Sequence, residues 1–102
     1  PYLERFKKRN DKFFPIAWHT FEGLIQEKHL KNEQEAIKSY QSALRQPYDD
    51  EYTKEYHAFA YAGLARIALR AGDRKKAITY YKKVEELAEY KALIKEAKTF
   101  LK

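Results

Sequence analysis

Two stretches of the chain repeat one another, residues 35–44 and residues 76–85. Both carry the frame Ala-Ile-x-x-Tyr-x-x-(Ala/Val), which starts at Ala36 in the first stretch and at Ala77 in the second. Each frame follows a residue of a type that caps helices, Asn32 or Asp73. Because a helical repeat unit buries its apolar face only against its neighbours, the pattern predicts a stacked array of helix pairs with a curved surface.

Length and composition support a single small domain built from helices. The chain has 102 residues, of which only three are Gly and three are Pro, and 35% are charged. Residues that favour helices dominate, so we predict an all-α fold. The chain contains no cysteine, which excludes disulfides, thiolate metal sites and cysteine nucleophiles.

No apolar run in the sequence approaches the roughly 20 residues that a membrane-spanning helix needs. We therefore expect a soluble protein. The cytoplasm is the first expectation for its location, and the periplasm or the cell exterior, after removal of a signal peptide, is the second. The chain begins at Pro1 instead of a methionine, so we expect a domain of a longer protein.

Residues that start and stop helices predict the first two helices. Pro15 suits a first helical turn, so a helix is predicted from there to about residue 29. Asn32 and Glu35 predict a capping box at the start of a second helix, which Pro47 ends.

Three further helices are predicted in the second half of the chain. An acidic loop at residues 46–52 leads into a long helix over residues 53–71. Gly72 suits the left-handed residue that ends such a helix, and the next helix is predicted over residues 73–88. A last amphipathic segment, residues 90–101, is predicted to cover the end of the stack.

The second helix pair resembles a tetratricopeptide repeat. Its residues 61–68 (YAGLARIA) and the later run Ala77-Ile78-Thr79-Tyr80-Tyr81 follow that family's order: an aromatic residue, a Leu with a small neighbour, then Ala-x3-aromatic in the partner helix. The first pair keeps Ala36-x3-Tyr40 but turns at Lys31-Asn32 instead of Gly-Asp. The two frames lie 41 residues apart rather than 34, which predicts about seven extra residues, either in the connection between residues 47 and 56 or at the start of the following helix.

The resemblance implies a short α-solenoid of about five to six antiparallel helices. A first repeat would span residues 15–50 and a second repeat residues 53–89. A capping helix would follow at residues 90–102, and a basic segment, residues 1–14, would precede the repeats.

The resemblance also implies a binding groove, because the first helix of each repeat in this family lines a concave face that holds a partner chain. The candidate residues are Trp18, Phe21, Ile25, Lys28 and His29 in the first repeat, and Phe59, Ala62, Arg66, Leu69 and Arg70 in the second. We expect an apolar face with a basic edge that binds a peptide carrying apolar and acidic residues. Arg66 and Arg70 are predicted to be surface residues that orient this peptide. The implied function is a non-enzymatic scaffold for protein–protein interaction, with no cofactor.

Two other functions stay open. The net charge of +6 fits a basic helical module that contacts nucleic acid. That alternative is less favoured, because most Tyr and Phe residues fall at positions needed for helix packing and no RNA-recognition signature is present. The other alternative is a structural or self-associating domain, because a short stack needs a cap at each end and residues 1–14 are a short cap. Homo-oligomers are expected in that case.

Candidate catalytic and metal-binding groups are sparse. His19, His29 and His57 are the only histidines, and none stands in a His-Glu-x-x-His motif. The acidic residues 49–51 and Glu55 lack the Gly and the alternating oxygen ligands of a calcium loop, so we expect a solvated turn. The three Gly residues form no phosphate-binding loop. We predict no catalytic residue, no metal site and no enzymatic activity.

Overall fold

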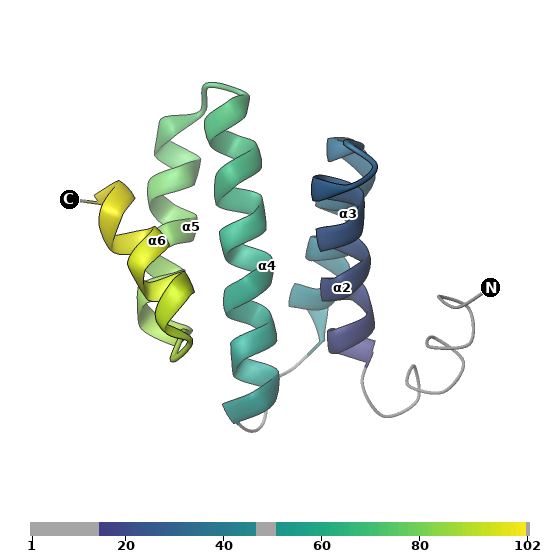
Figure 1. Cartoon of the computed structure of the whole chain (residues 1–102), viewed down its shortest axis with the longest axis horizontal. Coiled ribbons are helices and arrows are strands. Elements are labelled where there is room, and N and C mark those ends of the chain that lie inside the picture. The colour runs from purple at the N-terminus through teal and green to yellow at the C-terminus, as the bar shows by residue number, and fades with distance from the viewer. Residues whose placement is uncertain (1–14, 47–50, 102) are drawn as a thin grey trace.

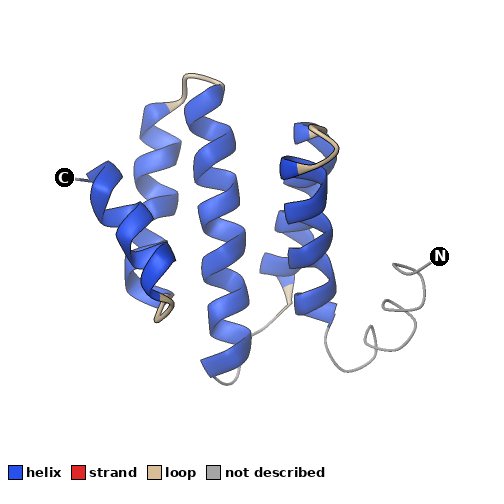
Figure 2. Cartoon of the chain, viewed as in Figure 1, coloured by secondary structure: helices blue, strands red, loops and turns tan. Residues whose placement is uncertain are grey.

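The structure is a computed structural model that describes the backbone of residues 15–46 and 51–101, and the side chains of residues 19–46 and 54–101. These residues form helices and no strand (Figure 2), which confirms the all-α prediction for this part of the chain. The helices are α2 (Pro15–Lys28), α3 (Glu33–Arg45), α4 (Glu51–Arg70), α5 (Arg74–Leu87) and α6 (Lys91–Leu101). The predicted helix bounds agree with these to within two residues. The basic segment 1–14 and most of the acidic loop lie outside the described residues.

Helix α4 is the centre of the arrangement and contacts α2, α3, α5 and α6. In Figure 1 this long helix stands between α2 and α3 on one side and α5 and α6 on the other. Its two sides pack into two apolar clusters. One cluster joins α4 to α3 and contains Ala60, Leu64 and Ile67 of α4. The other joins α4 to α5 and α6 and contains Ala58, Ala62, Ala65, Tyr81, Val84, Leu87, Leu93 and Ala97.

The two turns within the helix pairs use the predicted caps. The Asn32 side chain accepts a hydrogen bond from the Glu35 backbone N–H at 3.3 Å, and the Asp73 side chain accepts one from Lys76 at 3.1 Å. The reciprocal half of the predicted capping box is not formed, because the Asn32 N–H donates to the Gln26 carbonyl and the Glu35 carboxylate lies 3.4 Å from the Lys38 ammonium. Each helix pair therefore starts its second helix with one side-chain cap.

A left-handed residue precedes each cap. Gly72 has φ +82°, as expected for the residue after a helix end, and the equivalent Lys31 has φ +56°. A residue with a Cβ atom is strained in this region, and glycine is not. The first turn therefore has a left-handed residue before its cap, as the second does, but lacks the favourable glycine.

Tyr40 sets the spacing of α2, α3 and α4. Its fully buried ring lies against the backbones of Gly23 on α2 and Gly63 on α4. A Cβ atom at Gly23 would lie 2.6 Å from the Tyr40 ring, and one at Gly63 would lie closer still. The Tyr40 ring can lie directly against the backbones of α2 and α4 only because neither glycine has a side chain.

Candidate functional site

A chain of hydrogen bonds runs through all five described helices. The Tyr40 hydroxyl on α3 donates to Glu27 Oε1 on α2 at 2.6 Å. Arg66 on α4 binds the same carboxylate through Nε, at 2.9 Å from Oε2, and through Nη2, at 3.0 Å from Oε1. Its Nη1 lies 3.0 and 2.9 Å from the two oxygens of Glu96 on α6, and the Tyr81 hydroxyl on α5 donates to Glu96 at 2.7 Å. We call these five residues the Arg66 network.

The two tyrosines of the Arg66 network occupy the same place in the repeated frame. Tyr40 is the fourth residue after Ala36, and Tyr81 is the fourth after Ala77. Each hydroxyl orients one carboxylate, and both carboxylates bind the single guanidinium of Arg66. Arg66 on α4 therefore links the α2–α3 pair on one side to α5 and α6 on the other, through Nε and Nη2 to Glu27 and through Nη1 to Glu96.

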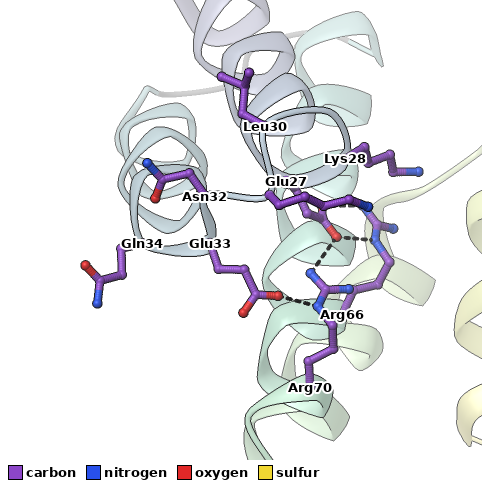
Figure 3. Close-up of a pocket in the computed structure, with 9 residues that line it drawn as sticks. Glu27, Lys28, Leu30, Asn32, Glu33, Gln34, Arg66 and Arg70 are labelled. Carbon is purple, nitrogen blue, oxygen red and sulfur yellow. Dashed lines mark hydrogen bonds and ion pairs between the residues drawn. The ribbon is translucent and has the colours of Figure 1, made fainter.

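Arg70 extends the network toward solvent. Its Nη2 lies 3.1 Å from Glu27 Oε2, and its Nε donates to the carboxylate of Glu33 at the start of α3. Figure 3 shows the side chains of Glu27, Glu33, Arg66 and Arg70 converging where α2, α3 and α4 meet. Arg70 and Glu33 are both close to half exposed, so this outer pair is more weakly held than the inner one.

The Glu27 carboxylate is charged although its side chain is only 3% exposed. Burial would raise its pKa, but hydrogen bonds from Arg66 and Tyr40 and the positive charge of Arg66 outweigh that effect. The pKa of Glu27 therefore lies below its ordinary value. Buried carboxylates are tolerated only when they are paired in this way.

The two tyrosines and the arginine of the Arg66 network also keep one protonation state near neutral pH. Burial and the neighbouring carboxylate raise the pKa of the Tyr40 hydroxyl and that of the Tyr81 hydroxyl above their ordinary value. Burial would lower the pKa of Arg66, but its bonds to Glu27 and Glu96 outweigh burial and raise it. The shifts move these groups away from neutrality, whereas a general acid or base needs a pKa near the working pH. The network is suited to holding positions rather than to transferring protons.

A hollow of about 760 Å³ opens above this network. It lies between the end of α2, the start of α3 and the second half of α4 (Figure 3), and its lining residues are Glu27, Lys28, Leu30, Lys31, Asn32, Glu33, Gln34, Arg66 and Arg70. Leu30 is 65% exposed, and Lys28 and Lys31 are exposed beside it. Neither lysine forms an ion pair with the described residues. The hollow therefore has a floor of paired charges and a rim of unpaired cations around one exposed leucine.

The structure brings three of the predicted groove residues together at this hollow, Lys28, Arg66 and Arg70. The other groove residues lie apart from it. Phe59 is half-buried and packs on Tyr90 with ring centroids 5.6 Å apart, and Phe21 meets Tyr56 edge-on at 6.0 Å.

The remaining predicted groove residues differ in exposure. Leu69 and His29 are exposed and Ile25 is half-buried. Ala62 is fully buried among the residues that join α4 to α5 and α6, so its methyl group does not reach the surface. The Trp18 side chain lies outside the described residues, although its backbone belongs to α2.

The expectation that Arg66 is a surface residue is wrong. Its side chain is 19% exposed and is bound by Glu27 and Glu96. Reversing its charge would place two carboxylates against a third, so a change at Arg66 would test folding before it tested binding. Arg70 is nearer to the expectation, because its side chain is 46% exposed.

Sequence reasoning missed the carboxylates of the Arg66 network. Glu27 follows Leu24 by three residues, and Glu96 follows Leu93 by three, so both acids stand on helix faces that otherwise pack into the protein. An acid at such a position signals a buried partner. The arginine that pairs with both could not be identified, because it is 39 residues from one and 30 from the other.

Glu55 of the acidic cluster and His57 have structural contacts. Glu55 accepts hydrogen bonds from the backbone N–H groups of Glu89 at 2.8 Å and Tyr90 at 3.3 Å, so it caps the approach to α6 instead of being only solvated. His57 Nε2 lies 2.6 Å from the Gln46 carbonyl and ties α4 to the end of α3. No group of three or more acidic or histidine side chains within the described ranges could hold a metal ion.

Comparisons of the chain with protein-family models, with curated proteins and with solved structures find no match. Among residues 15–46 and 51–101, no helix has the length and apolar character needed to cross a membrane.

Proposed function

We propose that the chain is a non-enzymatic binding module for a partner polypeptide, which docks over the hollow between α2, α3 and α4. The observation that carries this proposal is that the charges on the floor of the hollow are paired, whereas the lysines at its rim are not. The floor charges of Glu27 and Arg66 are satisfied by each other, whereas Lys28 and Lys31 at the rim have no ion-pair partner in the described part of the chain. A rim with unpaired charge gives a partner something to bind, and a paired floor keeps its shape while it binds.

The rim chemistry selects the kind of partner segment. Two lysines favour carboxylates, and the exposed Leu30 offers an apolar contact beside them. The segment that fits has acidic side chains next to apolar ones. Arg70 adds a half-exposed guanidinium, a group well suited to a carboxylate, at the side of the hollow.

The repeated frame supports a tetratricopeptide-like solenoid as the architecture behind this function. Helices α2 and α3 form one pair and α4 and α5 form another, joined by turns with the same cap. Ala36 and Ala77 are both fully buried, as expected for the small residues at the contact within each pair. In that family the helices equivalent to α2 and α4 line the binding face, and both border the hollow.

The proposal is tested by selecting binding peptides and then removing the rim charge. A library of random peptides displayed on phage is selected on the immobilised chain, and affinities of selected peptides are measured by fluorescence anisotropy. Selected sequences should combine acidic and apolar residues. The double variant Lys28→Glu with Lys31→Glu should weaken them about tenfold, which corresponds to about 1.4 kcal/mol.

The matched control is Lys95→Glu with Lys98→Glu on α6, which changes the net charge equally at a place outside the hollow. It should leave peptide affinity nearly unchanged. Peptides without acidic residues, or equal losses in the two double variants, would show that the hollow is not the docking site.

A further inference from the structure

A second basic surface lies on α6, on the opposite side of that helix from the core. Lys91, Lys95 and Lys98 are spaced four and three residues apart, so they share one face, and all three are exposed. With Ile94 and Thr99 they line a shallow hollow of about 390 Å³. Leu93 and Ala97 occupy the other face and are buried.

The charge of this face is not balanced by nearby acids. Glu96 is the single carboxylate of α6, and it is held on the inner side by Arg66 and Tyr81. Two other exposed lysines do have a partner within their own helix: Lys38 lies 3.4 Å from Glu35, and Lys83 lies 3.8 Å from Glu86. No ion pair joins the three lysines of α6 to any described residue.

The distribution of charge along the chain also places the excess of positive charge at the α6 end of the molecule. Residues 74–102 contain nine Lys or Arg and four Asp or Glu residues, whereas residues 15–73 contain seven and nine. The excess positive charge of the helical part is therefore concentrated in α5 and α6. A local excess of one sign attracts ligands of the opposite sign and raises their association rate.

Another hollow lies where α5 meets the end of α6. It also measures about 390 Å³ and is lined by Arg74, Ile78, Lys82 and Glu85 of α5 with Phe100 and Leu101 of α6, so it holds two cations and one carboxylate. The Arg74 guanidinium lies over the Phe100 ring, 5.0 Å from its centre, which holds this cation in a fixed place.

We propose that the outer face of α6 binds the phosphate backbone of a single-stranded nucleic acid. Lys91 and Lys98 are separated by two helical turns, about 10 Å along the axis, so the three ammonium groups form a line. A line of cations beside shallow hollows fits a flexible linear polyanion. Tyr90, directly before Lys91, is 54% exposed and offers an aromatic ring close to the start of this line.

A lipid surface fits the same face less well. Helices that bind membranes insert an apolar face, and the apolar residues Leu93 and Ala97 of α6 are already buried in the protein. What remains exposed is three lysines with Ala92 and Thr99, and the larger apolar side chains Ile94, Phe100 and Leu101 are half-buried.

The test is a binding titration with a fluorescein-labelled oligouridylate of about 20 nucleotides, followed by anisotropy at several salt concentrations. Binding should weaken with salt with a logarithmic slope of about −2, as expected for three contacts to a single strand. Lys95→Glu with Lys98→Glu should lower the affinity about tenfold or more and make the slope shallower. Lys95→Arg with Lys98→Arg should retain the affinity, because the contacts to phosphate need a positive charge and arginine keeps it.

The control is the rim variant Lys28→Glu with Lys31→Glu, which alters net charge by the same amount and should change the affinity less than about threefold. Equal losses in the two variants would mean that only net charge matters, and full binding by the α6 variant would place the site elsewhere. Binding to vesicles rich in anionic lipid without binding to the oligonucleotide would also overturn the proposal. Peptide binding at the hollow between α2, α3 and α4 is measured in its own titration. Either proposal can therefore fail without the other.

Discussion

Tyr40 and Tyr81 occupy the same place in two helix pairs, yet their rings are held in different ways. Tyr40 is fully buried between the backbones of Gly23 and Gly63, with no space for another atom. Tyr81 is packed on the Phe100 ring, with centroids 5.0 Å apart, at the side of the molecule that α6 covers. Both hydroxyls nevertheless donate to a carboxylate that is bound to Arg66, Glu27 in one case and Glu96 in the other. The polar end of the repeated tyrosine is thus preserved while its apolar surroundings differ.

The carboxylates that receive these hydroxyls differ as well. The Glu27 side chain is 3% exposed and the Glu96 side chain is 30% exposed. Water can replace a lost partner at Glu96 and cannot do so at Glu27. The α2–α3 side of the Arg66 network should therefore be the more sensitive of the two to substitution.

Removing the shared guanidinium should have the largest effect. Arg66→Ala leaves Glu27 buried without its main counter-charge, and breaking a buried pair in this way costs about 3–5 kcal/mol. The free energy of unfolding is measured by urea denaturation. Lys38→Ala, which removes an exposed cation paired only with Glu35, is the control and should cost less than about 0.5 kcal/mol. A similar loss in both variants would show that the Arg66 network contributes no more than a surface pair.

Adding a methyl group beside Tyr40 should have the next largest effect. Gly63→Ala overpacks the Tyr40 ring and should cost about 2–3 kcal/mol. Gly23→Ala should cost somewhat less, because its Cβ meets the ring at a slightly greater distance. Combining Gly63→Ala with Tyr40→Leu should recover part of the loss by opening space. No recovery in the double variant would mean that the ring does not set the helix spacing.

Deleting each hydroxyl compares the two sides directly. Tyr40→Phe should cost about 1.5–2 kcal/mol, since it removes a hydrogen bond to a buried charge. Tyr81→Phe should cost about half as much, because Glu96 is reached by solvent. Thermal and urea unfolding of the two variants measure the difference. Equal costs would contradict the view that the two sides differ in solvent access.

Acid should weaken the α2–α3 side through Glu27. Because the pKa of Glu27 is lowered in the folded state, the stability that its charge contributes is present above its ordinary value of 4.5 and is lost as the pH falls through the lower folded value. The free energy of unfolding should thus decline in this acidic window, and Glu27→Gln should remove part of the decline. An identical pH profile in the variant would show that other carboxylates account for it.

The smallest expected effect concerns the two turns. Lys31→Gly places glycine where the first pair has a strained lysine, as Gly72 already does in the second. The relief of backbone strain should exceed the added flexibility of the unfolded chain and stabilise the protein by up to about 1 kcal/mol. Gly72→Lys should have the opposite sign. A lower melting temperature for Lys31→Gly would mean that the lysine side chain makes a stabilising contact at the hollow.

Local signals in the sequence predicted the helices well because each boundary depends on a few neighbouring residues. Pro15 begins α2, Asn32 and Asp73 cap α3 and α5, and Gly72 takes the left-handed conformation. The candidate site was predicted only in part. Lys28, Arg66 and Arg70 do meet at one hollow, but the sequence did not reveal that Arg66 is already occupied by two carboxylates.

The sequence alone determined which segments are helical, where they turn and which tyrosines correspond, because these depend on interactions between residues a few positions apart. Only the tertiary structure decided which charges are paired and which are left at the surface. Glu27, Arg66 and Glu96 come from three helices, and the Coulomb energy between them depends on distance and burial, which no spacing along the chain specifies. In the folded structure Lys28, Lys31 and the lysines of α6 have no ion-pair partner among the described residues. These are the charges available for binding.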